Sequence, residues 1–483
     1  MIARTREAID LVTLRRAVQG AAARYPMARA RMRTGLLGRR WSFPDVADIP
    51  IITASGHDDG DLWDAFAGLC SRPFALSRVP AVRVLHMRLP EDDALAVAAH
   101  HVALDGLSVA MLLHAILERC VALEPRVALE PRVALEPRVV TRTRRPRGTA
   151  VDNLVDGGVS GSATARGDIC GGGIAGGDIA GGDIAGGGIA GGDIAGGDAC
   201  AGLPRHRRRA APSMERISRL VPGVAPLRQP VQGRIAPAPG LGRANRTSPN
   251  SRACVYGVYC MAVPVPKPGR PATGGTVTVN DLLLAAAAAA VEQWNTAAGR
   301  ETGRLRVRMP INLRDRDGEV ALGNHTGDAV IAMTPLDRRD PETLLAAVCR
   351  QTAANKAAGP PAETGNALRG TAWLPGPARH ALLRVAATVA RPLLMPTASV
   401  TNLGRLPGRL TSGADTPRIT SLYFAAFAGL PQGLVITATG YGDDLNLAFC
   451  YHRDLFDQSA VRRFAALYRV ALDDLTRVPE PRT

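Results

Sequence analysis

The segment His100-His101-Val102-Ala103-Leu104-Asp105-Gly106 follows an apolar stretch, residues 94–99 (ALAVAA), and precedes residues 107–119, where apolar side chains recur at helical spacing. Residues 81–89 (AVRVLHMRL) have the composition of an adjacent strand, and the turn 90–93 joins the two. The pattern therefore predicts a strand, a loop that carries two histidines, and a helix.

This position gives the loop residues distinct chemical roles. A histidine at a strand end is accessible to solvent or substrate, and an imidazole that titrates near neutral pH can accept a proton from an attacking hydroxyl or amine. Asp105 can hold the turn by pairing with an arginine or with backbone amides. Gly106 permits either a backbone conformation or a close approach that a side chain would block. Alone, such a histidine pair is more often a structural feature of a turn than a catalytic one.

The loop resembles the HHxxxDG motif of acyltransferases of the chloramphenicol acetyltransferase-like superfamily. These include condensation domains of nonribosomal peptide synthetases, wax ester synthase/diacylglycerol acyltransferases and polyketide-associated acyltransferases. Further segments resemble this superfamily in the same order along the chain. They are residues 24–29 (RYPMAR), 71–84 (SRPFALSRVPAVRV), 278–284 (TVNDLLL), 310–314 (PINLR) with Gly323-Asn324, and 400–406 (VTNLGRL).

The resemblance implies an α/β fold of two chloramphenicol acetyltransferase-like lobes with the active-site tunnel between them. It implies that His101 is the general base, that His100 shapes the loop, and that Asp105 forms a structural ion pair. For the arginine of that pair we select Arg29, with Arg24 behind it. The candidate substrate contacts, some of which could stabilise the oxyanion, are Asn280, Ser399, Thr401 and Asn402.

Asn280 has a competing structural role. It lies between Thr278 and Asp281, whose spacing predicts a capping box at the start of a helix, and a helix start is the commoner role for such a segment.

The implied reaction transfers an acyl group from a thioester to a small-molecule alcohol or amine. The thioester is acyl-CoA or the phosphopantetheine of an acyl carrier protein, and these are the expected partners and co-substrates. We expect no permanently bound cofactor and no metal, because direct transfer from an activated thioester needs a base, positioning and oxyanion stabilisation. The NDLLL segment favours lipid esterification, whereas VTNLGRL favours condensation chemistry in secondary metabolism.

The composition is that of a folded protein. Of 483 residues, 46% are apolar and 21% charged, which excludes a wholly disordered chain and a coiled-coil rod. The net charge of +16 comes almost entirely from arginine, since Lys267 and Lys356 are the only lysines. This bias, with abundant Ala, Gly and Pro, indicates a GC-rich genome more than a nucleic-acid-binding surface.

Cysteine spacing and the length of apolar runs indicate the cellular compartment in which the protein is expected. The eight cysteines lie far apart and form no CxxC pair, so neither a zinc site nor a disulfide framework is expected. We expect a cytoplasmic monomer, with peripheral association with a membrane or lipid body left open. The longest apolar run, 282–291, is too short to cross a bilayer, so no transmembrane helix is expected.

Composition also divides the chain into an N-terminal lobe (1–120), a low-complexity insertion (121–250) and a C-terminal lobe (251–483). In the insertion, VALEPR occurs three times from Val121 to Arg138 and a GGDIA-like pentad recurs between Gly167 and Asp198. Such sequence cannot bury enough apolar surface to offset its ordering entropy, so we expect disorder. Outside the insertion, we predict strands at 255–265, 304–311, 398–403, 433–439 and 445–451, and helices at 7–24, from 278, and at 341–357, 376–393 and 457–475.

Two departures from the superfamily pattern favour an alternative function. Tyr25 and Ala28 stand where RHxxLR has His and Leu, and the expected first helix lacks the strand that usually precedes it. The alternative is a catalytically degenerate module that binds a carrier protein or synthetase. A nucleic-acid binder built on the arginines of 201–250 is the weakest hypothesis, because that run has no interleaved aromatics.

Overall fold

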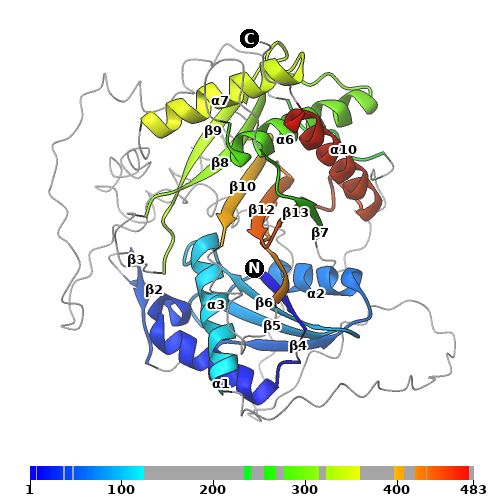
Figure 1. Ribbon diagram of the computed structural model, residues 1–483. Helices are drawn as coiled ribbons and strands as arrows, with labels where there is room; N and C mark the ends of the chain where they lie inside the picture. Colours follow the sequence, from blue (N-terminus) through cyan, green and yellow to red (C-terminus); the bar gives the residue numbers. More distant parts are fainter. Residues whose placement is uncertain are drawn as a thin grey trace, which may run out of the picture.

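The computed structural model describes residues 1–6, 8–35, 38–45, 48–123, 233–239, 241, 255–267, 277–314, 322–358, 396–406, 419–430 and 432–477. Two sheets with their helices form two lobes, seen one above the other in Figure 1. This is the predicted α/β class with two lobes. The predicted helix 376–393 and residues 124–232 of the insertion lie outside the described residues.

The N-terminal lobe is built on a five-stranded sheet in the order β11-β1-β6-β5-β4. Its strands are β1 (Ile2–Thr5), β4 (Ile51–Ser55), β5 (Val82–Arg88), β6 (Asp93–Ala99) and β11 (Ile419–Tyr423). Its helices are α1 (Leu11–Arg24), α2 (Asp59–Ser71) and α3 (Gly106–Leu123), and a 3-10 turn, η1 (Pro26–Arg29), leads to the separate pair β2 (Arg31–Gly35) and β3 (Gly38–Ser42).

Both faces of this sheet are covered, which explains why its central strand β6 is apolar almost throughout. Successive side chains of a strand point to opposite faces. Val84 therefore packs in the cluster formed with α1 and α3, whereas its neighbour Leu85 packs in the cluster formed with α2. Helix α2 also contacts β7 of the other lobe, so it lies between the two sheets (Figure 1).

Side-chain caps set where the helices begin. The Asp10 carboxylate accepts from the backbone N–H of Thr13 at 2.8 Å, so the first helix begins at Leu11 and not at residue 7. The predicted capping box is confirmed: Thr278 Oγ1 accepts from the Asp281 N–H at 3.3 Å, and Asp281 Oδ2 accepts from the Thr278 N–H at 2.8 Å.

The C-terminal lobe is built on a six-stranded sheet in the order β7-β13-β12-β10-β8-β9. The strands are β7 (Tyr256–Pro264), β8 (Leu305–Asn312), β9 (Thr326–Met333), β10 (Ala398–Arg405), β12 (Leu434–Tyr441) and β13 (Asp444–His452). Helices α6 (Val279–Ala297), α7 (Pro341–Ala357) and α10 (Gln458–Thr476) contribute to one large core with this sheet. The predicted strands and the helices from 278, at 341–357 and at 457–475 are confirmed with shifts of a few residues at their ends.

The boundary between the lobes differs from the one drawn on composition. Strand β11, which lies in the range assigned to the C-terminal lobe, pairs antiparallel with β1 in the N-terminal sheet. The chain therefore crosses back into the first lobe before it returns to form β12. The expected absence of a strand before the first helix is also wrong, because β1 occupies residues 2–5 and pairs with both β6 and β11.

Part of the expected disordered insertion is folded. Helix α3 continues to Leu123, and residues 233–239 lie against the C-terminal lobe, where Ile235, Ala236 and Ala238 are buried. Trp294 Nε1 donates to the Ala236 carbonyl at 2.8 Å. Burial of these apolar residues and the hydrogen bonds of the segment to α6 offset the entropy that is lost when it is ordered.

Helix α3 is, among the described residues, the one helix that is long and apolar enough by composition to span a membrane. Half of that stretch is buried in this structure, and α3 packs against α1 and β6. Its apolar character is accounted for by its place in the N-terminal core.

Candidate active site

Asp105 is the centre of the most extensive polar network at the junction of the lobes. Its side chain is buried and accepts from the backbone N–H of Ser108 at 2.9 Å, which caps the first turn of α3. The backbone N–H of Asp105 donates to the carbonyl of Gly323, from the other lobe, at 3.1 Å. The end of the HHxxxDG loop is therefore fixed to both its own helix and the opposite lobe.

Arg314, which follows β8, supplies the positive charge. Its Nη1 lies 2.8 Å from Asp105 Oδ2, and its Nη2 donates to Asp105 Oδ1 at 2.9 Å. The same guanidinium donates to Ser108 Oγ at 2.6 Å. Two parallel contacts between a planar guanidinium and a carboxylate form the strongest kind of ion pair that proteins use.

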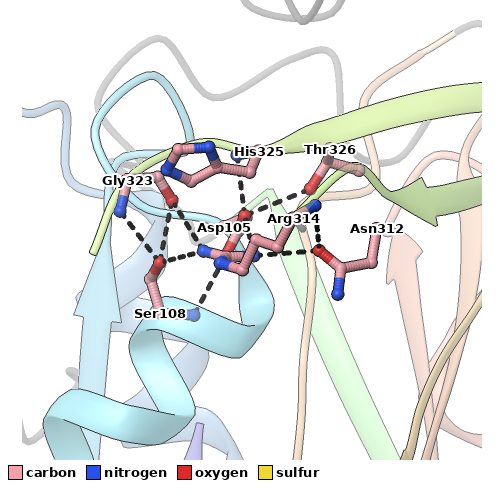
Figure 2. A network of polar contacts seen from close by, with 7 residues as sticks. All are labelled: Asp105, Ser108, Asn312, Arg314, Gly323, His325 and Thr326. Carbon is pink, nitrogen blue, oxygen red and sulfur yellow. Dashed lines mark hydrogen bonds and ion pairs between the residues drawn. The ribbon is translucent and has the colours of Figure 1, made fainter. Parts of the chain in front are cut away.

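The short segment before β9 completes the network (Figure 2). The backbone N–H of His325 donates to Asp105 Oδ2 at 2.8 Å, and Thr326 Oγ1 donates to the same oxygen at 3.4 Å. Ser108 Oγ donates to the Gly323 carbonyl at 2.8 Å and accepts from the Gly323 N–H at 3.0 Å. Each carboxylate oxygen of Asp105 thus accepts at least one hydrogen bond from a residue of the C-terminal lobe.

These contacts keep Asp105 ionised. Burial by itself would raise the pKa of its carboxyl group, but the hydrogen bonds from Arg314 and from the N–H groups of His325 and Ser108 outweigh it and hold the pKa below its ordinary value. An ionised Asp105 retains its attraction for Arg314 over the whole physiological pH range.

The prediction that Arg29 or Arg24 pairs with Asp105 is wrong. The Arg29 guanidinium donates instead to backbone carbonyls of Ala22, Pro44 and Asp45, which ties η1 to the segment after β3. The Arg24 guanidinium lies over the Tyr25 ring, 5.3 Å from its centroid. The ion pair joins the lobes and is not made within the first lobe, because Asp105, directly before α3, lies against the residues that follow β8 and begin β9.

The two motif histidines differ in their surroundings. His101 is exposed, in the turn formed by residues 101–103. His100 is partly buried, and its Nδ1 accepts from the backbone N–H of Val102 at 3.2 Å. Burial lowers the pKa of His100, and the neighbouring His101 lowers it further, so its imidazole is neutral at pH 7. The loop thus presents His101 outward while His100 holds the turn.

Gly106 allows the lobes to approach each other. A Cβ atom at this position would lie 2.7 Å from Phe424 Cζ and 3.1 Å from Leu403 Cδ2. Phe424 directly follows β11 and Leu403 lies near the end of β10, so the predicted close approach is present.

Candidates on β10 and α6 have separate outcomes. Ser399 has no exposed surface, and its hydroxyl accepts from Arg308 at 3.1 Å, so its prediction as a substrate contact is wrong. Thr401 and Asn402 are partly exposed and adjoin Leu403, which lies near the loop. Asn402 Oδ1 accepts from the Gly404 N–H at 2.8 Å in a local turn.

Asn280, on α6, lies apart from these candidates. Its Nδ2 contacts Met309 Sδ at 2.8 Å, and no contact among the described residues joins it to the loop.

Arg314, Ser108 and His325 are site residues that the sequence reasoning missed. Arg314 ends the PINLR segment and His325 directly follows Gly323-Asn324, and both segments resemble the superfamily. The signal that could have found Arg314 and His325 was the resemblance of both segments, 310–314 and Gly323-Asn324, to the same superfamily.

Comparisons with known proteins bear on the fold. No family model matches the chain. Two curated proteins of Mycobacterium tuberculosis, "Uncharacterized protein MT2362" and "Uncharacterized protein Rv2305", are each 26% identical to it over 482 residues, which is 97% of this chain and 93% of theirs.

The solved structures to which the chain is similar include parts of nonribosomal peptide synthetases. A four-domain synthetase, holo-AB3403 bound to AMP and glycine, matches with a TM-score of 0.51 and 13% identity over 99% of this chain and 31% of its own. The synthetase FmoA3 matches with a TM-score of 0.50 and 14% identity over 100% of this chain and 41% of its own. The chain therefore shares the fold of a part of these synthetase structures, and its two α/β lobes agree with the fold that the HHxxxDG segment led us to expect.

Proposed function

We propose that the chain is an acyltransferase that moves an acyl group from a CoA or carrier-protein thioester to a hydroxyl or amine acceptor, with His101 as general base. One observation carries the proposal. The buried network around Asp105 fixes the end of the HHxxxDG loop from both lobes, while His101 on the same loop remains exposed. A rigid loop that presents an exposed imidazole is what general-base catalysis requires.

In the proposed step, His101 accepts the proton of the acceptor O–H or N–H while the oxygen or nitrogen attacks the thioester carbonyl. The C–S bond then breaks, the acyl group stays on the acceptor as an ester or amide, and the departing thiolate takes the proton from His101. Thr401 and Asn402 remain candidates for contacts to the oxyanion that forms at the carbonyl, because they adjoin Leu403, which packs at the loop.

The fold supports a carrier-protein partner, since one of the matched structures is a four-domain nonribosomal peptide synthetase. An acyl-CoA donor, a cytoplasmic location and a monomeric state belong to the same proposal. Metabolic assignment to lipid esters or to secondary metabolites depends on the acceptor.

The test is release of free thiol from acyl-CoA and acyl-carrier donors with a panel of alcohols and amines. His101→Ala should lower turnover by about 10²- to 10⁴-fold, the usual contribution of a general base. His57→Ala is the matched control, because His57 is an exposed histidine at the start of α2, outside the loop. Turnover that survives in His101→Ala would rule out this mechanism.

The alternative of a binding module without catalysis gives a different result. It predicts tight binding to a carrier protein that His101→Ala leaves unchanged, and no thiol release with any donor. The presence of β1 removes one of the two departures that favoured this alternative. The other departure, at Tyr25 and Ala28, lies in η1 and the residue before it, and Ala28 is fully buried there.

A further inference from the structure

The segment 71–84 (SRPFALSRVPAVRV) resembles the superfamily but has no part in the reaction proposed above. In the structure, two side chains of this segment, Arg83 and Phe74, connect it to His100 of the HHxxxDG loop. Arg83, on β5, contacts Phe74, which follows α2, and Phe74 contacts His100. This arrangement connects a helix end and a strand to the first histidine of the motif.

Arg83 holds the backbone beside Phe74 through hydrogen bonds. Its Nη1 donates to the carbonyl of Arg72 at 2.7 Å and its Nη2 to the carbonyl of Pro73 at 2.5 Å. The guanidinium carbon lies 3.9 Å from the centroid of the Phe74 ring, within the range of a cation–π contact. Arg83 thus donates hydrogen bonds to the backbone just before Phe74 and also contacts the face of the Phe74 ring.

Phe74 in turn contacts His100. The two ring centroids are 5.8 Å apart and the ring planes are perpendicular, the edge-to-face geometry that aromatic pairs prefer. The backbone of His100 is fixed separately, because its N–H donates to the Ala81 carbonyl at 2.8 Å and extends the β5–β6 pairing by one bond. What Phe74 restrains is therefore the orientation of the imidazole.

That orientation matters for His101. The His100 Nδ1 accepts from the backbone N–H of Val102, so the imidazole closes a short ring that contains the backbone of His101. A neutral histidine that accepts at Nδ1 carries its proton on Nε2. If the imidazole turned or became protonated, this bond would be lost. The turn that carries His101 would then depend on the Ala103 and Leu104 N–H groups, which donate to the His100 carbonyl at 2.9 and 3.2 Å, and its first residues would be less firmly held.

We propose that Phe74 and Arg83 are positioning residues for His101, because they hold the His100 imidazole in the orientation and tautomer that close the turn. This inference rests on the proposed role of His101 as general base. The residues act through His100 and do not contact the acceptor or the thioester.

Burial of His100 supports the proposal. Burial is the main cause of its lowered pKa, and Phe74 is one of the side chains that cover it. The charged or titratable groups on this side of His100 are His101 on the same turn and, beyond the Phe74 ring, Arg83 from β5. The neighbouring His101 lowers the pKa of His100, and the positive charge of Arg83 gives no stabilisation to a protonated His100.

The first test needs no substrate. Protein labelled with ¹⁵N in the histidine rings should show His100, assigned with His100→Gln, as the Nε2–H tautomer with Nδ1 accepting. Phe74→Leu should raise the pKa of His100 and mix its tautomers, because the smaller side chain admits water and leaves the imidazole free to turn. Phe74→Tyr, which keeps the ring, should leave the spectrum unchanged, as should Phe43→Leu at an exposed phenylalanine of the same lobe.

The second test is kinetic. Phe74→Leu should lower kcat by about 10- to 100-fold, the loss that follows from small misplacement of a catalytic group. The acidic limb of its pH profile should move to higher pH, because His100 becomes protonated more easily. Arg83→Lys keeps the charge but cannot bond both carbonyls in the same planar way, so it should show the same changes to a smaller extent.

An unchanged His100 spectrum in Phe74→Leu, with wild-type kcat and pH profile, would overturn the inference. Its failure is distinguishable from failure of the proposed function. If His101→Ala retains full turnover, the general-base role is wrong whatever the spectrum of His100 shows. If His101→Ala is inactive and Phe74→Leu matches wild type, only the positioning role is wrong.

Discussion

Arg314 and Asp105 lie 209 residues apart in the chain and form a two-point ion pair, with contacts of 2.8 and 2.9 Å. Asp105 directly precedes α3 in the N-terminal lobe, whereas Arg314 follows β8 in the C-terminal lobe. The side chains are 2% and 11% exposed, so the pair is shielded from water and salt. It fastens the two lobes together at the loop that carries His101.

Asp105→Asn should destabilise the protein strongly. Asparagine keeps the shape of the side chain but leaves the Arg314 guanidinium buried without its counter-charge, which typically costs about 3 to 5 kcal/mol. The matched control is Asp64→Asn, because Asp64 also pairs across the lobes, with Arg453 at 3.0 Å, but the two side chains are 72% and 38% exposed. That variant should lose less than about 1 kcal/mol. Urea denaturation measures both, and equal losses would contradict a structural role for the buried pair.

The stability of the lobes should depend on pH through Asp105. Its pKa in the folded protein is lower than in the unfolded chain, so its contribution is fully present above the unfolded pKa of about 3.9 and is lost as the pH falls through the folded pKa. As the pH falls below about 4, the free energy of unfolding should therefore decrease more steeply for wild type than for Asp105→Asn. Parallel curves would mean that other carboxylates account for the acid sensitivity.

The parts of the structure that the sequence predicts well are local. The capping box at Thr278 and Asp281 depends on residues three apart, and the strand, loop and helix around residues 94–119 depend on neighbouring side chains. These contacts are encoded within a few residues, so spacing and residue type suffice to find them.

The parts that the sequence reasoning missed depend on distant contacts. Most basic residues of the chain are arginines, and nothing in the spacing of Asp105 and Arg314 selects that arginine from the others. Strand β11 is a short segment whose place in the N-terminal sheet follows from its pairing with β1, more than 400 residues away. Such pairings are set by the packing of the whole fold, which periodicity does not reveal.

Gly106→Ala should disturb the junction of the lobes. The added methyl group would lie 2.7 Å from Phe424 Cζ, so the ring or the loop must shift, and overpacking of this kind costs about 1 to 3 kcal/mol. The control is Gly68→Ala in α2, where a Cβ meets nothing within 4 Å and alanine should be neutral or stabilising. Phe424→Leu introduced with Gly106→Ala should restore part of the stability. Thermal denaturation of the three variants checks this, and a loss that Phe424→Leu does not relieve would place the clash elsewhere.

Asn295 should hold residues 233–239 on the C-terminal lobe. It is fully buried on α6, its Oδ1 accepts from the Ala236 N–H at 2.8 Å, and its Nδ2 donates to the Arg234 carbonyl at 2.8 Å. Asn295→Ala leaves both backbone groups without these partners, at a cost of about 1 to 3 kcal/mol for each group that stays buried. The segment should then detach locally, because this costs less than keeping the unpaired groups buried.

Detachment has a specific readout. Trypsin should cleave after Arg234 faster in Asn295→Ala than in wild type, since protease cleavage follows the population of the opened segment. Gln293→Ala is the matched control, because Gln293 lies on the same helix with an exposed side chain and should leave cleavage unchanged. Equal cleavage rates in Asn295→Ala and Gln293→Ala would show that the apolar contacts of Ile235, Ala236 and Ala238 hold the segment without these hydrogen bonds.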